Sequence, residues 1–512
     1  MSEVAGNKQI AKNTFFLYAR MIILLVVGLY SSRVTLIALG VSDYGIYNVV
    51  GGLVTMFVFV NYAMVNSTQR YITYELGKGD IGKLRDVFST SINIHAGVAL
   101  IIFFLSETIG LWFLYHKMVI PEERMSAALW IYQFSILNCV ISVMNAPYNA
   151  LIIAHEKMSA FAYISLLDAG LKLLIVIFLQ YANTDRLILY GGLLLLITIA
   201  DRVIYGLYCQ RNFIESKYRY VWNKQLTFEM TRFASWNLVG NLSYVCYTQG
   251  LNIVLNMFFS PVVNAARGIA VQVQSVIANF SYNIENAIKP QITKNYAQGD
   301  KSRMLQLMYA SARLSFFALL VLSMPVFFEA ETLLGMWLAE VPDHTVNFVR
   351  LTILILLADS LTGPLLTAAQ AMGDIKKYQL TVSLLCFMIL PCAYVSLLII
   401  PVPEIVFSIN FIIVLITQIV KLVVVSRQID ISKSEYTRNV FFRSLAVLLL
   451  SCVFVIPLRL LIAASVIRLL MVVIISIASV IVSVYTVGLS TYERELTREK
   501  TLELFNKIKD SI

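Results

Sequence analysis

Hydrophobic residues recur along almost the whole chain in runs of about 20 or more, separated by short polar segments. A run of that length, wound into an α-helix, crosses the roughly 30 Å hydrocarbon core of a bilayer. The pattern therefore predicts an all-α polytopic membrane protein with about fourteen transmembrane helices. We expect these spans near residues 12–38, 43–74, 84–114, 123–153, 158–182, 187–210, 227–258, 262–297, 302–328, 344–372, 376–399, 402–426, 440–460 and 464–488.

Spans seven and eight each carry a polar stripe. The polar residues recur at spacings of three and four, which places them on one face of a helix. Each unpaired amide or cation that faces hydrocarbon costs on the order of several kcal/mol, so the stripes must face protein or water. The stripe residues are Asn237, Asn241, Tyr244, Thr248, Asn252 and Asn256 in span seven, and Asn264, Arg267, Gln274, Asn279, Tyr282, Asn286 and Lys289 in span eight.

These stripes predict that the two helices line an internal cavity. The alternative is that their polar residues only join helices by hydrogen bonds, as in many membrane bundles. One or two amides per helix would be enough for that role, whereas a stripe along nearly the whole helix favours a water-filled cavity. Span two carries a similar stripe, made of Asn48, Thr55, Tyr62, Asn66, Gln69 and Thr73.

The amino-acid composition excludes an ordinary soluble domain. Of the 512 residues, 59% are hydrophobic and only 14% are charged, whereas soluble domains average about 25% charged residues. The net charge of +10 does not indicate nucleic-acid binding, because Lys and Arg are concentrated in alternate loops. By the positive-inside rule, that alternation predicts that both termini are cytoplasmic.

The remaining residue types indicate neither a metal site nor a catalytic site. The six cysteines all lie within apolar runs, without metal-ligand spacing or a disulfide framework. Lys8 and Lys12 precede a long apolar helix with no small-residue cleavage site, which predicts an uncleaved first span. No loop is long enough for a folded domain, so we expect the protein to act within or across the bilayer, without a resident cofactor.

The two halves of the chain resemble each other. YITYELGKGD (71–80) aligns with QITKNYAQGD (291–300), and NAPYNALIIAHEK (145–157) aligns with TGPLLTAAQAMGDIK (362–376) with one small gap. Each copy has six spans, an even number, so both enter the membrane from the same side, related by a pseudo-two-fold axis along the membrane normal. Two such lobes around a cavity are typical of a transporter that works by alternating access.

The repeat also sets the expected domain boundaries. The last two spans lie outside it and form an addition at the C-terminus. The predicted parts are an N-terminal lobe (1–210), a cytoplasmic linker (211–226), a C-terminal lobe (227–426), a second cytoplasmic linker (427–439), the two additional spans (440–488) and a cytoplasmic tail (489–512).

Cations and amides inside the lobe spans are the candidate substrate-binding residues. Arginine presents a fork of donors that matches phosphate, and a cavity rich in cations and amides suits a ligand with a phosphate and many hydroxyls. For Arg33 and Arg70, snorkelling to a membrane interface is an equally good explanation. The candidate cavity residues are Arg20, Arg33, Asn48, Asn66, Arg70, Asn241, Asn252, Arg267, Gln274 and Lys289.

Three acids within the spans are candidates for coupling transport to H⁺ or Na⁺. Asp168 and Glu285 each have a Lys four residues later, a favourable helical pair for which neutralisation is the simpler role. Asp359 has no such local partner and precedes Gly363 and Pro364, where span ten is expected to bend. Asp359 is therefore the acid of greatest interest.

An ordered set of segments resembles a known family. NTFFLYARMIILLVVGLYSSRV, LGVSDYGIYNVVGG, NSTQRYITYELGKGD and SPVVNAARGIAVQVQ are similar to the openings of the two lobes in Wzx-type polysaccharide-export flippases of the MOP (MATE-like) superfamily. The resemblance covers the twelve repeat spans and, through the span count, the last two. It implies a flippase that moves an undecaprenyl-diphosphate-linked oligosaccharide from the cytoplasmic to the periplasmic leaflet of the bacterial inner membrane, for O-antigen (lipopolysaccharide) or capsule biosynthesis.

The resemblance also implies a cationic cavity in which Arg20 and Arg267 face the diphosphate or the sugars. Cation-driven alternating access is a further expectation, although span one lacks the Asp or Glu that multidrug members of the superfamily place there. The implied partners are the lipid-linked glycan and the bilayer, with polysaccharide polymerase or chain-length machinery as candidate protein partners.

Three other functions remain open. The first is a lipid II flippase, and the second is a cation-coupled multidrug or metabolite antiporter, against which the fourteen expected spans and the cationic stripes argue. The third is a membrane-embedded glycan polymerase or ligase, which would be expected to carry a sizeable periplasmic loop with catalytic residues. The four histidines are scattered, so we expect a transporter and not an enzyme.

Overall fold

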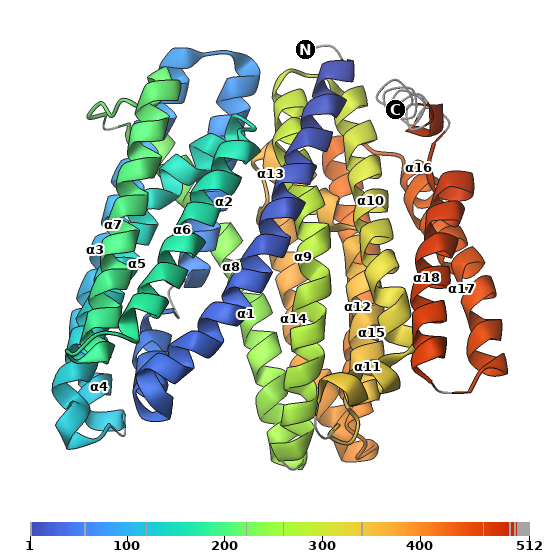
Figure 1. Cartoon of the computed structure of the whole chain (residues 1–512). Coiled ribbons are helices and arrows are strands. Elements are labelled where there is room, and N and C mark those ends of the chain that lie inside the picture. Colours follow the sequence, from blue (N-terminus) through green and yellow to red (C-terminus); the bar gives the residue numbers. More distant parts are fainter. Residues whose placement is uncertain are drawn as a thin grey trace, which may run out of the picture. The chain divides into compact units, whose positions relative to one another are not determined.

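The computed structural model describes residues 3–498 except positions 56, 57, 119, 222, 260, 339, 340, 464, 491, 492, 496 and 497. Within these residues the secondary structure is entirely helical (Figure 1), which confirms the all-α fold class. Most of the predicted tail 489–512 lies outside the described residues. The helices are α1 (Glu3–Thr55), α2 (Val58–Lys78), α3 (Ile81–Leu105), η1 (Ser106–Gly110), α4 (Leu111–Lys117), η2 (Glu122–Arg124), α5 (Met125–Ala154), α6 (Met158–Leu179), α7 (Arg186–Asn212), η3 (Ile214–Ser216), α8 (Lys224–Phe258), α9 (Pro261–Ala297), α10 (Lys301–Phe328), α11 (Ala330–Trp337), α12 (Thr345–Ser360), α13 (Gly363–Met372), α14 (Lys376–Ile399), α15 (Glu404–Ile429), α16 (Lys433–Tyr436), η4 (Thr437–Phe442), α17 (Arg443–Leu461), α18 (Val466–Ser483) and η5 (Val484–Gly488).

Eleven helical segments among the described residues are long and apolar enough to cross a membrane. Predicted spans seven and eight are helical but do not meet that criterion, because their polar stripes lower the mean hydropathy. Their helices, α8 and α9, have 35 and 37 residues, which is ample length for a bilayer about 30 Å thick. Predicted span two includes positions 56 and 57, which lie outside the described residues. The chain is therefore a multi-pass membrane protein.

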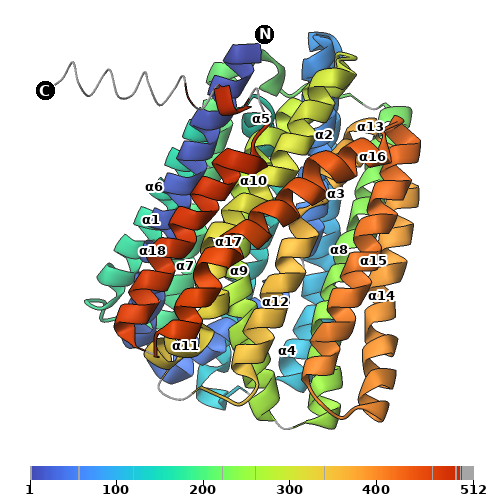
Figure 2. The ribbon, with the colours of Figure 1, turned by 90° about the vertical axis from the view of Figure 1, so that its right-hand side faces the viewer.

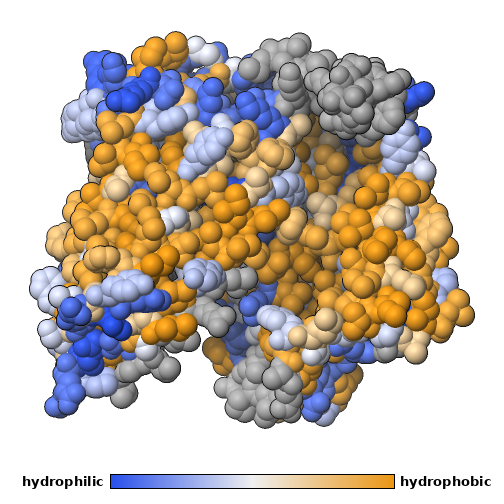
Figure 3. Space-filling view, viewed as in Figure 1, coloured by the Kyte–Doolittle hydropathy of each residue, from blue (hydrophilic) through white to orange (hydrophobic). Residues whose placement is uncertain are grey.

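The chain divides into two compact units, which we describe separately. Unit 1 comprises residues 1–242, 287–304 and 370–379, and unit 2 comprises residues 243–286, 305–369 and 380–512. In both units, the face shown in Figure 3 has hydrophobic residues over the middle of the helices and hydrophilic residues toward the helix ends. Apolar side chains such as Leu100, Ile101 and Phe104 are 58–62% exposed on α3, as expected for a surface that contacts lipid.

Unit 1 is built around α5. This helix packs against α2, α3 and α7, while α6 packs against α1 and α7 (Figure 1). The core around α5 includes the fully buried Ile131, Tyr132 and Ile136. The unit also contains the first part of α8, the last parts of α9 and α13, and the first turns of α10 and α14. Segments from both sequence repeats therefore meet inside it.

Unit 2 contains the middle of the second repeat and the two additional spans. Helix α12 packs against α15, and α17 packs against α18 (Figure 2). Its core includes the rings of Phe348 and Phe407, whose centroids lie 4.3 Å apart. A short helix that the sequence analysis did not predict, α11, occupies the acidic loop after span nine.

The aligned turns of the two repeats have the same geometry. Gly79 and Gly299 both adopt φ of +77°, a left-handed conformation that glycine reaches without steric cost. The next residue, Asp80 in one copy and Asp300 in the other, accepts a hydrogen bond from the backbone amide three residues later, at 3.0 and 2.9 Å. The correspondence of φ angles and helix N-caps supports the internal repeat.

Two helix breaks follow from single residues. Gly40, with φ of +76° and ψ of 166°, interrupts α1 between predicted spans one and two. The expected bend in span ten is confirmed, because α12 ends at Ser360 and α13 begins at Gly363. Pro364 accounts for this break, since its ring conflicts with the carbonyl four residues earlier, that of Ser360. In contrast, α5 continues through Pro147.

Candidate functional site

A cavity of about 220 Å³ in unit 2 collects residues of the predicted polar stripes. Thr248 and Asn252 of α8 meet Arg267 and Gln274 of α9, so part of each predicted stripe faces a common space. Helices α12 and α15 complete the wall. Further lining residues are Tyr244, Tyr247, Gln249, Thr352, Phe407 and Asn410.

Arg267 is the cation of this cavity. Its side chain is 6% exposed, its Nη2 donates to the carbonyl oxygen of Thr248 at 2.7 Å and its Nη1 donates to Oδ1 of Asn252. Its Nε has no hydrogen-bond partner, and no carboxylate pairs with it, among the residues that the structure describes. A cation buried without a counter-charge is costly, so this position favours an anionic ligand.

The sequence analysis missed Asn410 as a member of this site. It lies on α15 with 7% of its surface exposed, and its Oδ1 has no partner in the described part of the chain. A single amide in the apolar run FSINFIIVL was the available signal. Tyr247 and Gln249 were also missed, because each lies beside the stripe of span seven and outside its strict spacing.

Arg70 lies at the end of unit 1 that carries the Lys- and Arg-rich loops 78–85, 211–224 and 294–303, which we call the basic end. Its side chain is 8% exposed, and Nε and Nη2 donate to the carbonyl oxygens of Gln370 and Ala371 at 3.0 and 3.1 Å. These carbonyls belong to the last turn of α13, whose negative dipole end favours a cation. Arg70 therefore caps α13.

A second contact at the basic end is the counterpart of the first in the other repeat. Nε2 of Gln291 on α9 donates to both carboxylate oxygens of Glu156, at 2.6 and 2.7 Å. Gln291 aligns with Tyr71, the residue after Arg70, and Glu156 lies in the turn that follows α5, as Gly373 lies in the turn that follows α13. Both turn residues have positive φ, 58° and 88° respectively. Each repeat thus contacts the other's turn, and we call the pair of contacts the reciprocal latch.

The remaining candidate cations and amides lie in varied surroundings. Lys289 donates from Nζ to Oδ1 of Asn66 at 2.7 Å inside unit 1, and the Arg20 guanidinium lies 4.4 Å from the ring centroid of Phe161. Asn241 is half-buried. The side chains of two candidates, Arg33 and Asn48, lie outside the described part of the structure.

The candidate coupling acids have identifiable neighbours. Asp168 accepts from Nζ of Lys172 at 2.8 Å, the helical pair expected from their spacing. Asp359 pairs with Nζ of Lys421 at 2.8 Å, a partner on α15 that local sequence spacing could not show. The Glu285 carboxylate lies against the backbone of Gly363, at the break of span ten. Among the described residues, no cluster of His, Cys, Asp or Glu suits a metal ion.

Comparison with known proteins shows which proteins this chain resembles. Residues 238–395 match the MatE family, and no curated protein matches the sequence. A multidrug resistance MATE family transporter of the MOP superfamily, in an outward-facing conformation, has a TM-score of 0.69 at 13% identity, covering 83% of this chain and 96% of its own. The Vibrio cholerae MATE transporter VcmN scores 0.66 at 16% identity, covering 83% and 98%. The MATE transporter ClbM in complex with Rb⁺ scores 0.66 at 15% identity, covering 84% and 97%.

The chain has the fold of the MATE transporters. The MatE match contains Thr248, Asn252, Arg267 and Gln274 of the cavity in unit 2. The shared fold and the matched segment together support the resemblance to the MOP superfamily.

The latch predicts a pH-dependent stability of this MATE-fold protein. Glu156 is 7% exposed in the turn between α5 and α6. Burial raises its pKa above the ordinary 4.5, outweighing the hydrogen bonds from Gln291 and the charges of Lys294 and His155. Above the raised pKa the carboxylate is charged, and burying this charge lowers the stability of the folded state. That loss of stability becomes smaller as the pH falls toward about 4.5. Glu156→Gln should unfold at a higher temperature than the native chain near pH 8, with a difference that shrinks toward about pH 5.

Glu215→Gln is the matched control for this measurement. Burial tends to raise the pKa of Glu215, but the hydrogen bond with His155, a backbone hydrogen bond and the charge of His155 together lower the pKa below the ordinary value. The charged form is therefore stabilising, and Glu215→Gln should unfold at a lower temperature than the native chain near neutral pH. Equal responses of the two variants would contradict the assignment of Glu156.

Proposed function

We propose that the protein is a flippase that moves undecaprenyl-diphosphate-linked oligosaccharide repeat units from the cytoplasmic to the periplasmic leaflet of a bacterial inner membrane by alternating access, for O-antigen or capsule biosynthesis. The observation that carries the proposal is Arg267, a buried cation with no described carboxylate partner in a cavity lined by amides and tyrosines. A transporter of cationic drugs would gain nothing from that charge.

The cavity chemistry suits one part of such a ligand. The guanidinium is held by Thr248 and Asn252 on one side, which leaves its Nε available as a donor. Gln249, Gln274 and Asn410 offer amides to hydroxyl groups. At about 220 Å³ the space is below the roughly 300–1,000 Å³ of most drug-sized pockets, so it would receive the diphosphate or one sugar and not the whole glycan.

Alternating access gives the reciprocal latch a role in this proposal. By the positive-inside rule the basic end of unit 1 faces the cytoplasm. Arg70 and Glu156 then hold that end together, and their contacts must separate to admit a substrate from the cytoplasmic leaflet. Asp168, Glu285 and Asp359 remain the candidates for coupling this motion to H⁺ or Na⁺. Asp359 would exchange Lys421 for the ion.

The second candidate function is a cation-coupled multidrug antiporter, which the fold of a multidrug MATE transporter favours. The two functions differ in the sign of charge that the cavity must hold. Lipid II transport shares the diphosphate chemistry and differs only in the glycan. An enzymatic role in glycan polymerisation has no support from the transporter fold.

The deciding experiment measures leaflet exposure of undecaprenyl-diphosphate-linked repeat units in proteoliposomes, using a membrane-impermeant glycan-cleaving enzyme. We expect the native chain to move the lipid, and Arg267→Ala to slow movement by about 10- to 100-fold, the loss expected for one charge-assisted contact. Arg20→Ala tests the second candidate cation. Arg85→Ala is the control, because its exposed guanidinium bonds only the carbonyl of Lys217 among described residues.

Each outcome has a distinct meaning. Undiminished movement in Arg267→Ala would remove Arg267 from the substrate site while leaving the flippase. Failure of the native chain to move several lipid-linked glycans, together with H⁺- or Na⁺-driven efflux of a cationic dye, would establish the antiporter instead.

A further inference from the structure

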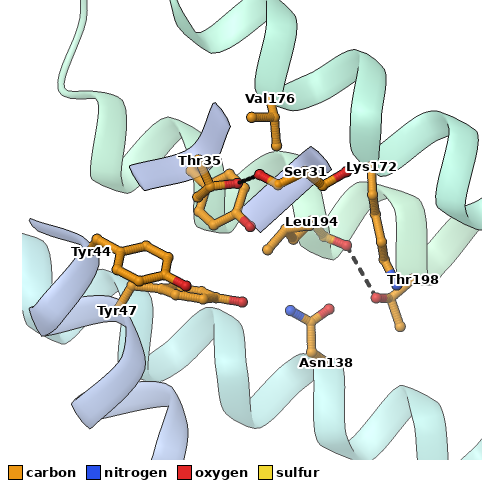
Figure 4. A pocket seen from close by; sticks show the side chains of 10 residues that line it. Ser31, Thr35, Tyr44, Tyr47, Asn138, Lys172, Val176, Leu194 and Thr198 are labelled. Atoms are coloured by element: carbon orange, nitrogen blue, oxygen red, sulfur yellow. Dashed lines mark hydrogen bonds between the residues drawn. The ribbon is translucent and has the colours of Figure 1, made fainter. Parts of the chain in front are cut away.

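A second cavity, of about 390 Å³, lies within unit 1, and its described lining includes none of the candidate substrate-binding residues. It is lined by residues of α1, α5, α6 and α7 (Figure 4). No role for this cavity follows from the fold or from the contacts described above. The chemistry of its wall shows what it could hold.

One side of the cavity is aromatic. Tyr44 and Tyr47 extend from α1 toward Asn138 on α5 (Figure 4). The ring of Tyr190 on α7 packs edge-on against that of Tyr47, with centroids 5.1 Å apart and planes at 66°. This packing holds the rings in place. Their faces can contact apolar C–H groups, and their hydroxyls can form hydrogen bonds.

Hydroxyl groups of α1 and α7 also line the cavity. The hydroxyl of Thr35 donates to the carbonyl of Ser31 at 2.7 Å, and that of Thr198 donates to the carbonyl of Leu194 at 3.1 Å (Figure 4). The Thr198 proton is used within its own helix, so its oxygen is left as an acceptor, whereas the Thr35 hydroxyl also bonds that of Tyr190. Such a wall suits a ligand that brings several donors.

Two buried polar atoms on this wall lack partners. Oδ1 of Asn138 and Oγ of Ser31 are shielded from solvent and make no hydrogen bond to any described residue. The Asn138 amide points into the cavity (Figure 4). Buried polar atoms are almost always satisfied in folded proteins, so the cavity must supply donors from water or from a ligand.

Lys172, the charged residue of the described lining, is paired with a carboxylate. The ammonium group of Lys172 lies 2.8 Å from the carboxylate of Asp168, four residues earlier on α6. In unit 2, by contrast, Arg267 has no described carboxylate partner. The unit 1 cavity therefore suits a neutral ligand with many hydroxyls, and the unit 2 cavity suits an anion.

We propose that the unit 1 cavity is a glycan subsite that binds one neutral sugar ring of the transported lipid-linked glycan. The inference rests on the proposed function and adds the residues that would recognise the sugar. Ring C–H groups lie on Tyr44 and Tyr47, and sugar hydroxyls donate to Asn138, Ser31 and Thr198. A volume near the low end of the roughly 300–1,000 Å³ range for ligand pockets limits the subsite to about one ring.

The test compares two ligands on the purified full-length chain. One is undecaprenyl diphosphate, and the other is a panel of hexosyl and N-acetylhexosaminyl diphosphate undecaprenols. We expect at least one sugar-bearing lipid to bind about three- to tenfold more tightly than the bare lipid, the gain expected from one or two satisfied acceptors. Asn138→Leu and Thr198→Val should abolish that difference and leave the affinity for the bare lipid unchanged.

Thr108→Val is the matched control, because the Thr108 hydroxyl also donates to a carbonyl four residues earlier but lines no part of the cavity. It should keep the full preference for the sugar-bearing lipid. Equal binding of the bare lipid and every sugar-bearing lipid by the native chain would overturn the subsite, with the cavity holding water only, and would leave the flippase standing. A preference that survives Asn138→Leu and Thr198→Val would also overturn it. Binding of neither lipid class would overturn the flippase and the subsite together.

Discussion

Arg70→Ala should open the basic end of unit 1. The variant loses two charge-assisted hydrogen bonds, to the carbonyl oxygens of Gln370 and Ala371. It also loses the stacking of the guanidinium on Tyr71 and Phe233, at 4.5 and 5.4 Å from the ring centroids. Together these contacts contribute about 3 kcal/mol, so the ratio of closed to open states should fall by roughly 100-fold.

The measurement is the labelling rate of a buried cysteine at this end. Ser67 is 2% exposed and donates to the carbonyl of Met230 inside unit 1. In a background with the six native cysteines replaced by alanine, Ser67→Cys should react with a membrane-impermeant maleimide at least about tenfold faster when Arg70 is alanine. Arg85→Ala is the matched control, since it removes an exposed bond to a backbone carbonyl at the same end.

Gly373→Ala should favour the open state of the basic end independently of Arg70→Ala. Gly373 has φ of +88°, and a Cβ there would lie 2.5 Å from Nη2 of Arg70. The alanine would therefore strain the turn and displace the guanidinium. Faster labelling in both variants would support the latch. If Arg70 binds substrate instead, Arg70→Ala should abolish lipid movement with no change in labelling.

The helices and the polar cavity of unit 2 could be predicted from the sequence because they depend on local spacing. Runs of apolar residues locate the spans, Pro364 locates the break in span ten, and three-and-four spacing brings Thr248 and Arg267 to one cavity. The polar stripes also explain why spans seven and eight are too hydrophilic to be recognised by hydropathy alone.

Contacts between residues far apart in the chain could not be predicted in this way. Asp359 and Lys421 are 62 residues apart, and no local pattern pairs them. Arg70 binds backbone carbonyls, which have no side-chain signature in the sequence. Its role depends on where α13 ends, a consequence of packing in unit 1. The sequence therefore indicates that Arg70 is a cation near a helix end, but not what it caps.

The largest loss of stability should follow from breaking the ion pair between Arg468 and Glu329 in unit 2. Nη2 of Arg468, in the first turn of α18, donates to Oε2 of Glu329 at 2.9 Å, and Nε lies 2.7 Å from Oε1. The side chains are 11% and 0% exposed. Removing one partner leaves a buried charge, so Arg468→Met should cost about 3–5 kcal/mol of unfolding free energy. Glu329→Gln should also be strongly destabilising.

The double variant Arg468→Met with Glu329→Met separates the cost of an orphaned charge from the value of the pair. Two apolar residues leave neither charge unpaired, so the double variant should be more stable than Arg468→Met alone. Arg459→Met is the control, because its contact with Glu331 is 3.9 Å long and exposed and should be worth less than about 1 kcal/mol. Thermal unfolding in detergent measures all four variants. A double variant less stable than Arg468→Met would contradict the account.

This ion pair also determines how the two additional helices are held. Near the middle of α10, Arg313 donates to Glu493, which follows η5, at 2.6 Å, and to the carbonyl of Asn439, in η4 before α17, at 3.1 Å. The segments that precede α17 and follow α18 are therefore also fastened to α10, and in an alternating-access cycle the two additional helices should move with unit 2. Cysteine cross-links between α10 and α18 should form at the same rate in native and Arg70→Ala chains. A change in that rate would mean that the additional helices move independently of α10.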